Sequence, residues 1–193
     1  MRLTDAEAFI LPKLRSELSD TLYYHSLHHT LDVMESVIRI AGAEGISDSE
    51  TLTLLRTGAL FHDTGFLFTY QGHENESCRL ARELLPGFGY SMPQIDTICG
   101  MIEATKIPQN PKNKLEEIIC DADLDYLGRD DFEAIAGCLY RELKARDRVA
   151  DERAWNAIQI KFLENHRYRT PTGRALRQPG KLIHLQKLRD TMT

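Results

Sequence analysis

The sequence has no long apolar run: nowhere in its 193 residues is there a stretch near the roughly 20 apolar residues that a membrane helix needs. Its start, MRLTDAEAF, lacks the basic segment, apolar block and small-residue cleavage site of a secretory signal. The four cysteines form no CxxC pair, so a thiolate metal site is not indicated. We therefore expect a cytoplasmic protein with reduced, buried cysteines and no membrane association.

Alternating strand patterns, internal repeats and low-complexity segments are also missing. Helical apolar spacing recurs instead, and Thr4–Glu7 has the pattern of a capping box that begins a first helix. A break at 170–173 precedes a last helical stretch. With 42% hydrophobic residues, the chain can bury the core of one domain. We predict an all-α fold with further helices at about 25–43, 47–63, 72–86, 91–107, 113–127, 131–146 and 151–166.

The formal net charge of -5 is unevenly distributed along the chain. Residues 166–193 hold seven Lys or Arg and one acid, a net charge of +6, so residues 1–165 carry -11. This basic segment could contact phosphates, or it could lie against the acidic remainder of the protein. Overall acidity argues against a general nucleic-acid binder, so we expect no stable binding of nucleic acid.

The pair His62-Asp63 lies at the end of an apolar helical stripe. Leu52, Leu55, Ala59 and His62 are spaced by three, four and three residues, which turns the imidazole toward the interior. A buried histidine beside a buried acid is costly unless the pair is hydrogen-bonded or binds a cation. The pair is therefore a candidate half of a metal site.

Two further histidines share a face of the helix in the segment YHSLHHTLDV. His29 lies within an apolar stripe that continues to Val33 and Val37, whereas His25 lies at the start of the helix. A buried position suits a metal ligand, and an accessible one suits a proton donor. A core histidine bonded to a carbonyl is the alternative for His29. His28 faces elsewhere and is expected at the surface.

The segment ICDADLDYLG supplies a candidate acid. Asp123 shares a helix face with Ile119 and Leu127, which turns its carboxylate inward. Helix capping or solvent exposure accounts better for Asp121 and Asp125, on the other side. Two imidazoles and two carboxylates form a mixed nitrogen and oxygen set that suits Mn, Fe, Co or Zn, or Mg with added waters.

These motifs together resemble the HD superfamily of metal-dependent phosphohydrolases, an all-α family named for its His-Asp doublet. The resemblance rests on LFHDTG, on the upstream HxxxV helix and on DADLDYLG, where the Ala122-Asp123 step selects Asp123 over Asp121. It covers about residues 23–128 and implies one domain over 1–193 with a helical C-terminal extension, residues 129–193. The metal ligands that it implies are His29, His62, Asp63 and Asp123.

YHSLHHTLDV is also similar to the YHNxxHAxDV segment of cyclic-nucleotide phosphodiesterases, a branch of the same superfamily. That similarity implies that His25 is the general acid that protonates the leaving oxygen. Ser26 replaces the asparagine of that branch, and TGFLFTYQGHE follows the doublet in place of a His-Pro-Gly continuation. Specificity for cyclic nucleotides is therefore not implied.

A second metal is a weaker expectation from the resemblance. His73 stands where dinuclear branches have a ligand to a second ion, but Thr105-Lys106 replaces the other histidine of that site. We expect one firm ion and a weaker second ion bridged by Asp63. Glu74 either activates the attacking water or simply favours the start of its helix.

The resulting hypothesis is a phosphohydrolase that cleaves a phosphomonoester or phosphodiester of a small nucleotide-like substrate with metal-activated water. The nucleotide comes from a similarity of AWNAIQIKFLENHRY to C-terminal regions of bacterial HD proteins linked to nucleotide signalling. Asp63, His25 and Glu74 are the candidate catalytic residues. Lys106 or Arg129 could bind a phosphate oxygen, or each is a solvated cation. The alternatives are a diiron oxygenase of the same superfamily, which Thr105 disfavours, and a non-catalytic nucleotide sensor.

Overall fold

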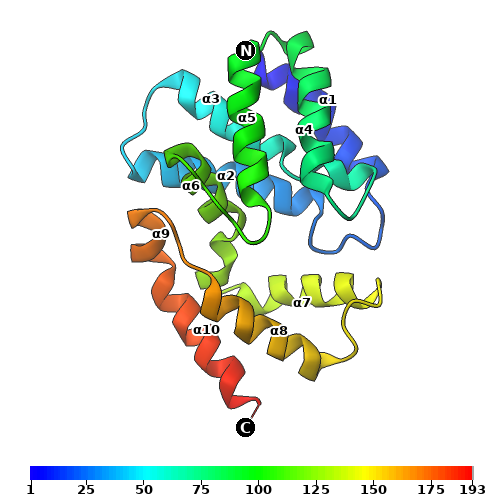
Figure 1. Ribbon diagram of the computed structural model, residues 1–193, viewed down its shortest axis with the longest axis vertical. Coiled ribbons are helices and arrows are strands. Elements are labelled where there is room, and N and C mark those ends of the chain that lie inside the picture. Colours follow the sequence, from blue (N-terminus) through cyan, green and yellow to red (C-terminus); the bar gives the residue numbers. More distant parts are fainter. Residues whose placement is uncertain (193) are drawn as a thin grey trace.

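A computed structural model describes residues 1–192, which form ten α-helices joined by loops and short 3-10 turns, with no strand among these residues (Figure 1). The all-α prediction is thus confirmed. In Figure 1 the helices α1 to α6, coloured blue to green, form the upper part of the molecule. The helices α7, α8 and α10, coloured yellow to red, lie below them, and the two termini are at opposite ends.

The upper part is a bundle whose apolar helix faces meet in one core. Its helices are α1 (Leu3–Glu17), α2 (Leu27–Ala43), α3 (Ser49–Phe61), α4 (His73–Leu84), α5 (Met92–Thr105) and α6 (Lys114–Asp123). Val37, Leu55, Ile98 and Ile119 are fully buried, one from each of the helices α2, α3, α5 and α6. These four helices pack on one another, so that the ends of α3 and α6 lie near α2.

The lower part has a second apolar cluster. This part of the molecule comprises α7 (Phe132–Lys144), α8 (Glu152–Asn165), α9 (Pro171–Leu176) and α10 (Gln178–Asp190). The 3-10 turn η3 (Asp125–Gly128) connects it to α6. Leu127, Phe132, Trp155 and Leu163 are among its buried residues. The C-terminal extension therefore has a core of its own, beside the end of α6.

Two of the predicted helix starts, at about 47 and 91, agree with the structure to within two residues. The Asp48 side chain accepts a hydrogen bond from the Thr51 backbone N–H at the start of α3, and Ser91 begins α5 in a capping box. The capping box at Thr4 was wrong, because α1 begins at Leu3 with Arg2 as a cap that makes no side-chain bond. The break at 170–173 was also wrong in part: Thr170 caps the short helix α9.

Helix α2 begins at Leu27, two residues later than predicted. The backbone N–H groups of Tyr24 and His25 both donate to the carboxylate of Glu142, in α7. The Glu142 carboxylate thus binds backbone N–H groups that would lie at the beginning of the helix if it started at His25. His25 consequently stands just before the helix and not on its apolar stripe.

Asp121 and Asp125 are not at the surface, where the sequence favoured them. Their exposed fractions are 1% and 2%. Asp121 accepts hydrogen bonds from the backbone N–H groups of Arg169 and Thr170, while Asp125 pairs with Arg39 and Arg177. The basic C-terminal segment thus lies against acidic groups of the bundle, because these contacts give buried carboxylates the partners that they need.

Two smaller expectations concern cysteines and membranes. None of the four cysteines is bridged; three are buried and Cys138 is half-buried. In the part of the chain that the structure describes, no helix combines the length and the apolar character that crossing a bilayer requires.

Candidate metal centre

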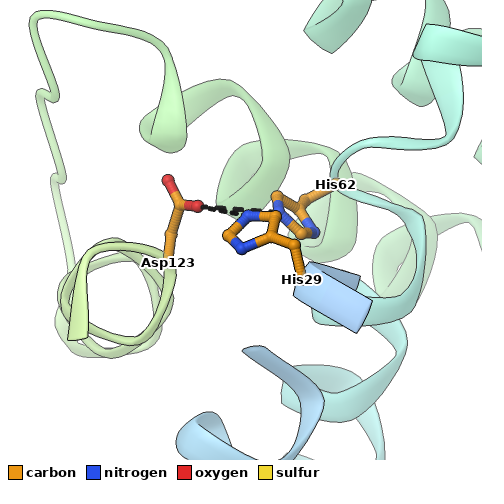
Figure 2. A group of neighbouring side chains, drawn as sticks. All are labelled: His29, His62 and Asp123. Carbon is orange, nitrogen blue, oxygen red and sulfur yellow. Dashed lines mark hydrogen bonds and ion pairs between the residues drawn. The ribbon is translucent and has the colours of Figure 1, made fainter. Parts of the chain in front are cut away.

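Three predicted ligands from distant parts of the chain meet at one point (Figure 2). His29 comes from α2, His62 follows the last residue of α3, and Asp123 ends α6. One ligand atom from each lies within 4.8 Å of the others. His29 Nε2 is 3.1 Å from Asp123 Oδ1 and 3.3 Å from His62 Nε2. Two imidazole nitrogens and a carboxylate oxygen therefore surround a common point.

The His62 imidazole is fixed by its own helix. Its Nδ1 donates a hydrogen bond to the carbonyl oxygen of Ala59 at 2.7 Å, and only 1% of the residue is exposed. The hydroxyl of Ser77, in α4, donates to the His62 carbonyl oxygen and holds the end of α3 from the other side. The bond at Nδ1 leaves Nε2 as the free nitrogen, which is how second-shell contacts usually orient a ligating histidine.

Asp63 completes the donor set. Its Oδ2 lies 3.3 Å from His62 Nε2 and 3.5 Å from His29 Nε2, yet this buried oxygen has no hydrogen-bond partner. Burial of an ionised oxygen without a bond is costly unless a cation binds it. The residues present therefore fit a divalent ion held by two nitrogens and two carboxylate oxygens.

The electrostatics of the cluster favour ionised acids. Burial raises the pKa of Asp123, but hydrogen bonds from His29 and His62 outweigh it and bring the value to about 2. The pKa of Asp63 is likewise opposed by burial and held well below its usual range by the charge of His62. Burial lowers the pKa of His62, whereas both carboxylates raise it well above normal. A cation would take the place of that proton.

His73, at the start of α4, approaches the other oxygen of Asp63. Its Nε2 is 3.4 Å from Asp63 Oδ1 and 3.7 Å from Glu74 Oε1. Asp63 thus faces the main cluster with one oxygen and His73 with the other, as a bridging carboxylate would. Thr105 is buried nearby and its hydroxyl donates to the carbonyl oxygen of Ile102, so that position offers no imidazole.

His25 lies beside the cluster and is held by Glu142. The two are joined by a 2.5 Å contact between His25 Nδ1 and Glu142 Oε1, and Tyr70 donates to the same oxygen. The ring of His25 stacks on Phe66 with 4.3 Å between centroids. Sequence reasoning missed Glu142. The available signal was an acid next to Leu143 on the apolar face of the helix at 131–146.

The two basic candidates do not reach the site. Arg129 pairs with Asp32 and Asp131, each at 2.7 Å, and it lines a different pocket from the cavity beside the metal cluster. Lys106 is exposed at the end of α5, outside the cavity beside the metal cluster. The ion pairs of Arg129 already neutralise its charge, and Lys106 is a cation in contact with solvent.

A cavity of about 420 Å³ opens beside the cluster. At one end it is lined by His25, Asp63, His73, Glu74 and Asp123. Its remaining walls come mainly from α7, α8 and η3 of the C-terminal extension. A small molecule in this cavity can thus reach the candidate ligands and His25 at once.

Comparisons with known proteins agree with this geometry. A family model described as HD domain matches residues 26–125, more than half of the chain, and the match includes all four predicted ligands. A crystal structure described as a predicted HD superfamily hydrolase, from an uncultured Thermotogales bacterium, is similar with a TM-score of 0.63 and 20% sequence identity. The similarity covers 100% of this chain and 98% of the other. None of the curated proteins matches.

Proposed function

Because the chain belongs to the HD-domain family, we propose that it is a metal-dependent hydrolase that cleaves a phosphomonoester or phosphodiester bond of a small molecule. The observation that carries the proposal is the meeting of His29, His62 and Asp123 at one point, together with the nearby buried Oδ2 of Asp63, which has no hydrogen-bond partner. Mn, Mg, Fe, Co or Zn would suit this donor set.

A divalent ion bound by these four residues would lower the pKa of a water molecule and neutralise charge on a phosphate oxygen. The residues around it have separate tasks. Asp63 Oδ1 faces the side of His73 and can accept a hydrogen bond from the attacking water. Glu74 lines the same end of the cavity and is the second acid able to orient that water.

His25 is the proton donor in this proposal. Because its Nδ1 is bound to Glu142, Nε2 is the nitrogen that can donate to a substrate in the cavity. Donation to the leaving oxygen completes the departure of the alcohol. The buried carboxylate of Glu142 accepts the hydrogen bond from Nδ1 and holds the ring in that orientation.

The test is a panel of phosphate esters against metals. Protein stripped with a chelator is reloaded with each of the five metals and assayed on monoesters, diesters, and cyclic and linear nucleotides. We expect activity that requires metal and that His62→Ala with Asp63→Ala abolishes. His28→Ala is the matched control, since His28 is exposed on the same helix as His29.

A metal-loaded protein that is inactive on the whole panel would contradict the proposal. Two iron ions per chain with oxygen consumption would favour an oxygenase instead. Tight nucleotide binding without turnover would favour a sensor.

A further inference from the structure

The cavity beside the metal cluster changes character along its length. Near the cluster its walls are polar, but α7 and α8 contribute Phe132, Leu139, Leu143, Trp155 and Phe162. Protein interiors are normally filled to the density of organic crystals. The whole cavity, about 420 Å³ from the metal cluster to the apolar walls of the C-terminal extension, is within the size range of sites for small ligands.

One face of α8 supplies much of this wall. Trp155, Ile158, Gln159, Phe162 and Leu163 are separated by three, one, three and one residues, so they lie on the same side of the helix. From sequence this stripe is explained by core packing alone. In the structure it borders open space, and an unfilled apolar cavity reduces stability. The stripe thus offers an apolar surface to a ligand in addition to the residues, such as Trp155 and Leu163, that it contributes to the core.

The charges that line the cavity do not suit a highly phosphorylated molecule. Among the lining residues, all of which the structure describes, there is no Lys or Arg. The ionisable groups near the metal cluster are the acids Asp63, Glu74 and Asp123, together with two histidines. A polyphosphate would place several negative charges beside these carboxylates, which is unfavourable in a partly buried site.

Polar partners for a nucleobase are also scarce along the apolar walls. Gln159 carries the amide there, and its nitrogen donates to Asn156. A base has several donors and acceptors, and leaving them unpaired in an apolar site costs binding free energy. Hydrocarbon needs no such partners.

The rim of the cavity is apolar as well. Ile107, after α5, is 54% exposed, and Ile158, in α8, is 45% exposed. Both side chains line the cavity. These two isoleucines would offer an apolar surface to a hydrocarbon chain that enters from solvent.

We propose that the substrate is a phosphate ester of an aliphatic alcohol, with the phosphate at the metal cluster and the hydrocarbon chain between α7 and α8. This inference rests on the proposed hydrolase and narrows its substrate. In the reaction the oxygen of water bonds to phosphorus, the ester P–O bond breaks, and the proton from His25 goes to the alcohol oxygen. The proton that the attacking water releases returns His25 to its protonated form, so that the step balances. The products are phosphate, or a phosphate monoester if the substrate is a diester, and a free aliphatic alcohol.

Binding of n-alkyl phosphonic acids tests this inference without turnover, because their P–C bond is not hydrolysed. Manganese-loaded protein is titrated calorimetrically with the methyl to decyl compounds, below the concentrations at which they form micelles. We expect the affinity to rise about three- to fourfold per methylene, as burial of each CH₂ predicts, and to level off once the cavity is full.

Two variants and one control test where the hydrocarbon chain of the ligand binds. Ile158→Glu places a charge at the rim, and we expect it to reduce the ratio of decyl to methyl affinity at least tenfold. Ile183→Glu is the matched control: Ile183 is 58% exposed on α10 and does not line the cavity, so the ratio should stay as in the wild type. Leu139→Trp fills part of the hollow, and the rise in affinity should level off at a shorter chain.

Equal affinity from methyl to decyl would overturn the inference, as would equal effects of the two glutamate variants. Tighter binding of a nucleoside phosphonate than of the alkyl compounds would also overturn it, while leaving the hydrolase intact. Failure of the hydrolase itself is measured separately, as inactivity on the ester panel.

Discussion

At the scale of single residues, Glu142 links the C-terminal extension to the candidate proton donor. Its side chain is fully buried and accepts hydrogen bonds from the backbone of Tyr24, from both the backbone and ring of His25, and from Tyr70. Burial raises the pKa of this carboxyl group, but the bond with His25 lowers it below its usual value. The ionised acid therefore holds the ring of His25 in one orientation as a positioning residue.

Glu142→Gln keeps the shape of that side chain and removes its charge. We expect kcat to fall on the order of 100-fold with little change in KM, because proton donation is impaired while substrate still binds. Glu133→Gln, on the exposed side of the same helix, is the control. An unchanged kcat would show that Glu142 serves packing alone.

At the scale of elements, a buried lysine joins α10 to the end of α8. Lys181 is 1% exposed, and its Nζ donates to the carbonyl oxygens of Leu163 and His166. These are carbonyl groups that the last turn of a helix leaves without partners. The imidazole Nδ1 of His166 lies 3.5 Å from the same nitrogen. Burial, together with the charge of Lys181, lowers the pKa of the His166 imidazole to about 3.

This histidine predicts a loss of stability in acid. The unfolded chain takes up the His166 proton near pH 6.5 and the folded chain near pH 3, so stability is complete above pH 6.5 and falls as the pH drops toward 3. In urea unfolding of metal-free protein, the wild type should lose about 3 kcal/mol more than His166→Gln between pH 7 and pH 4. His28→Gln should behave as the wild type. Parallel pH curves for the wild type and His166→Gln would contradict this role.

At the scale of the whole molecule, the metal centre joins three helices that are far apart in the sequence. His29 lies in α2, His62 and Asp63 follow α3, and Asp123 ends α6. An ion that binds this arrangement and not the unfolded chain stabilises the fold by mass action. The metal is thus expected to contribute to stability as well as to chemistry.

Removal of metal should therefore lower the melting temperature. With free metal at about 1,000 times its Kd the stabilisation is about 4 kcal/mol, which corresponds to a shift on the order of 10 °C for a chain of this size. Scanning calorimetry with chelator and with saturating metal measures the shift. The double variant of His62 and Asp63 should show none. Equal melting temperatures for the wild type in both conditions would rule out an ion at this place.

Much of the fold and the candidate ligand set could be predicted from sequence, because apolar spacing and the His-Asp doublet are local signals. Apolar spacing indicated the helices, and two of them begin close to the predicted positions, where Asp48 and Ser91 cap them in the structure. The doublet His62-Asp63 stood out as a costly inward pair, and family resemblance connected it to His29 and Asp123. The helix signals and the doublet lie within a few neighbouring residues, whereas the link to His29 and Asp123 comes from the resemblance.

Only the tertiary structure decided which charged groups are buried and what surrounds the site. Asp121 is satisfied by the backbone of residues 169 and 170, and Glu142 by residues 24 and 25, so their partners are 48 to 118 positions away. Spacing within one helix cannot reveal such partners. The same holds for the apolar face of α8, which resembles any core-facing stripe until its packing against α7 leaves a cavity. Local sequence determined the helices and the candidate ligands, whereas long-range packing decided which acid holds His25 and what walls the cavity beside the candidate site has.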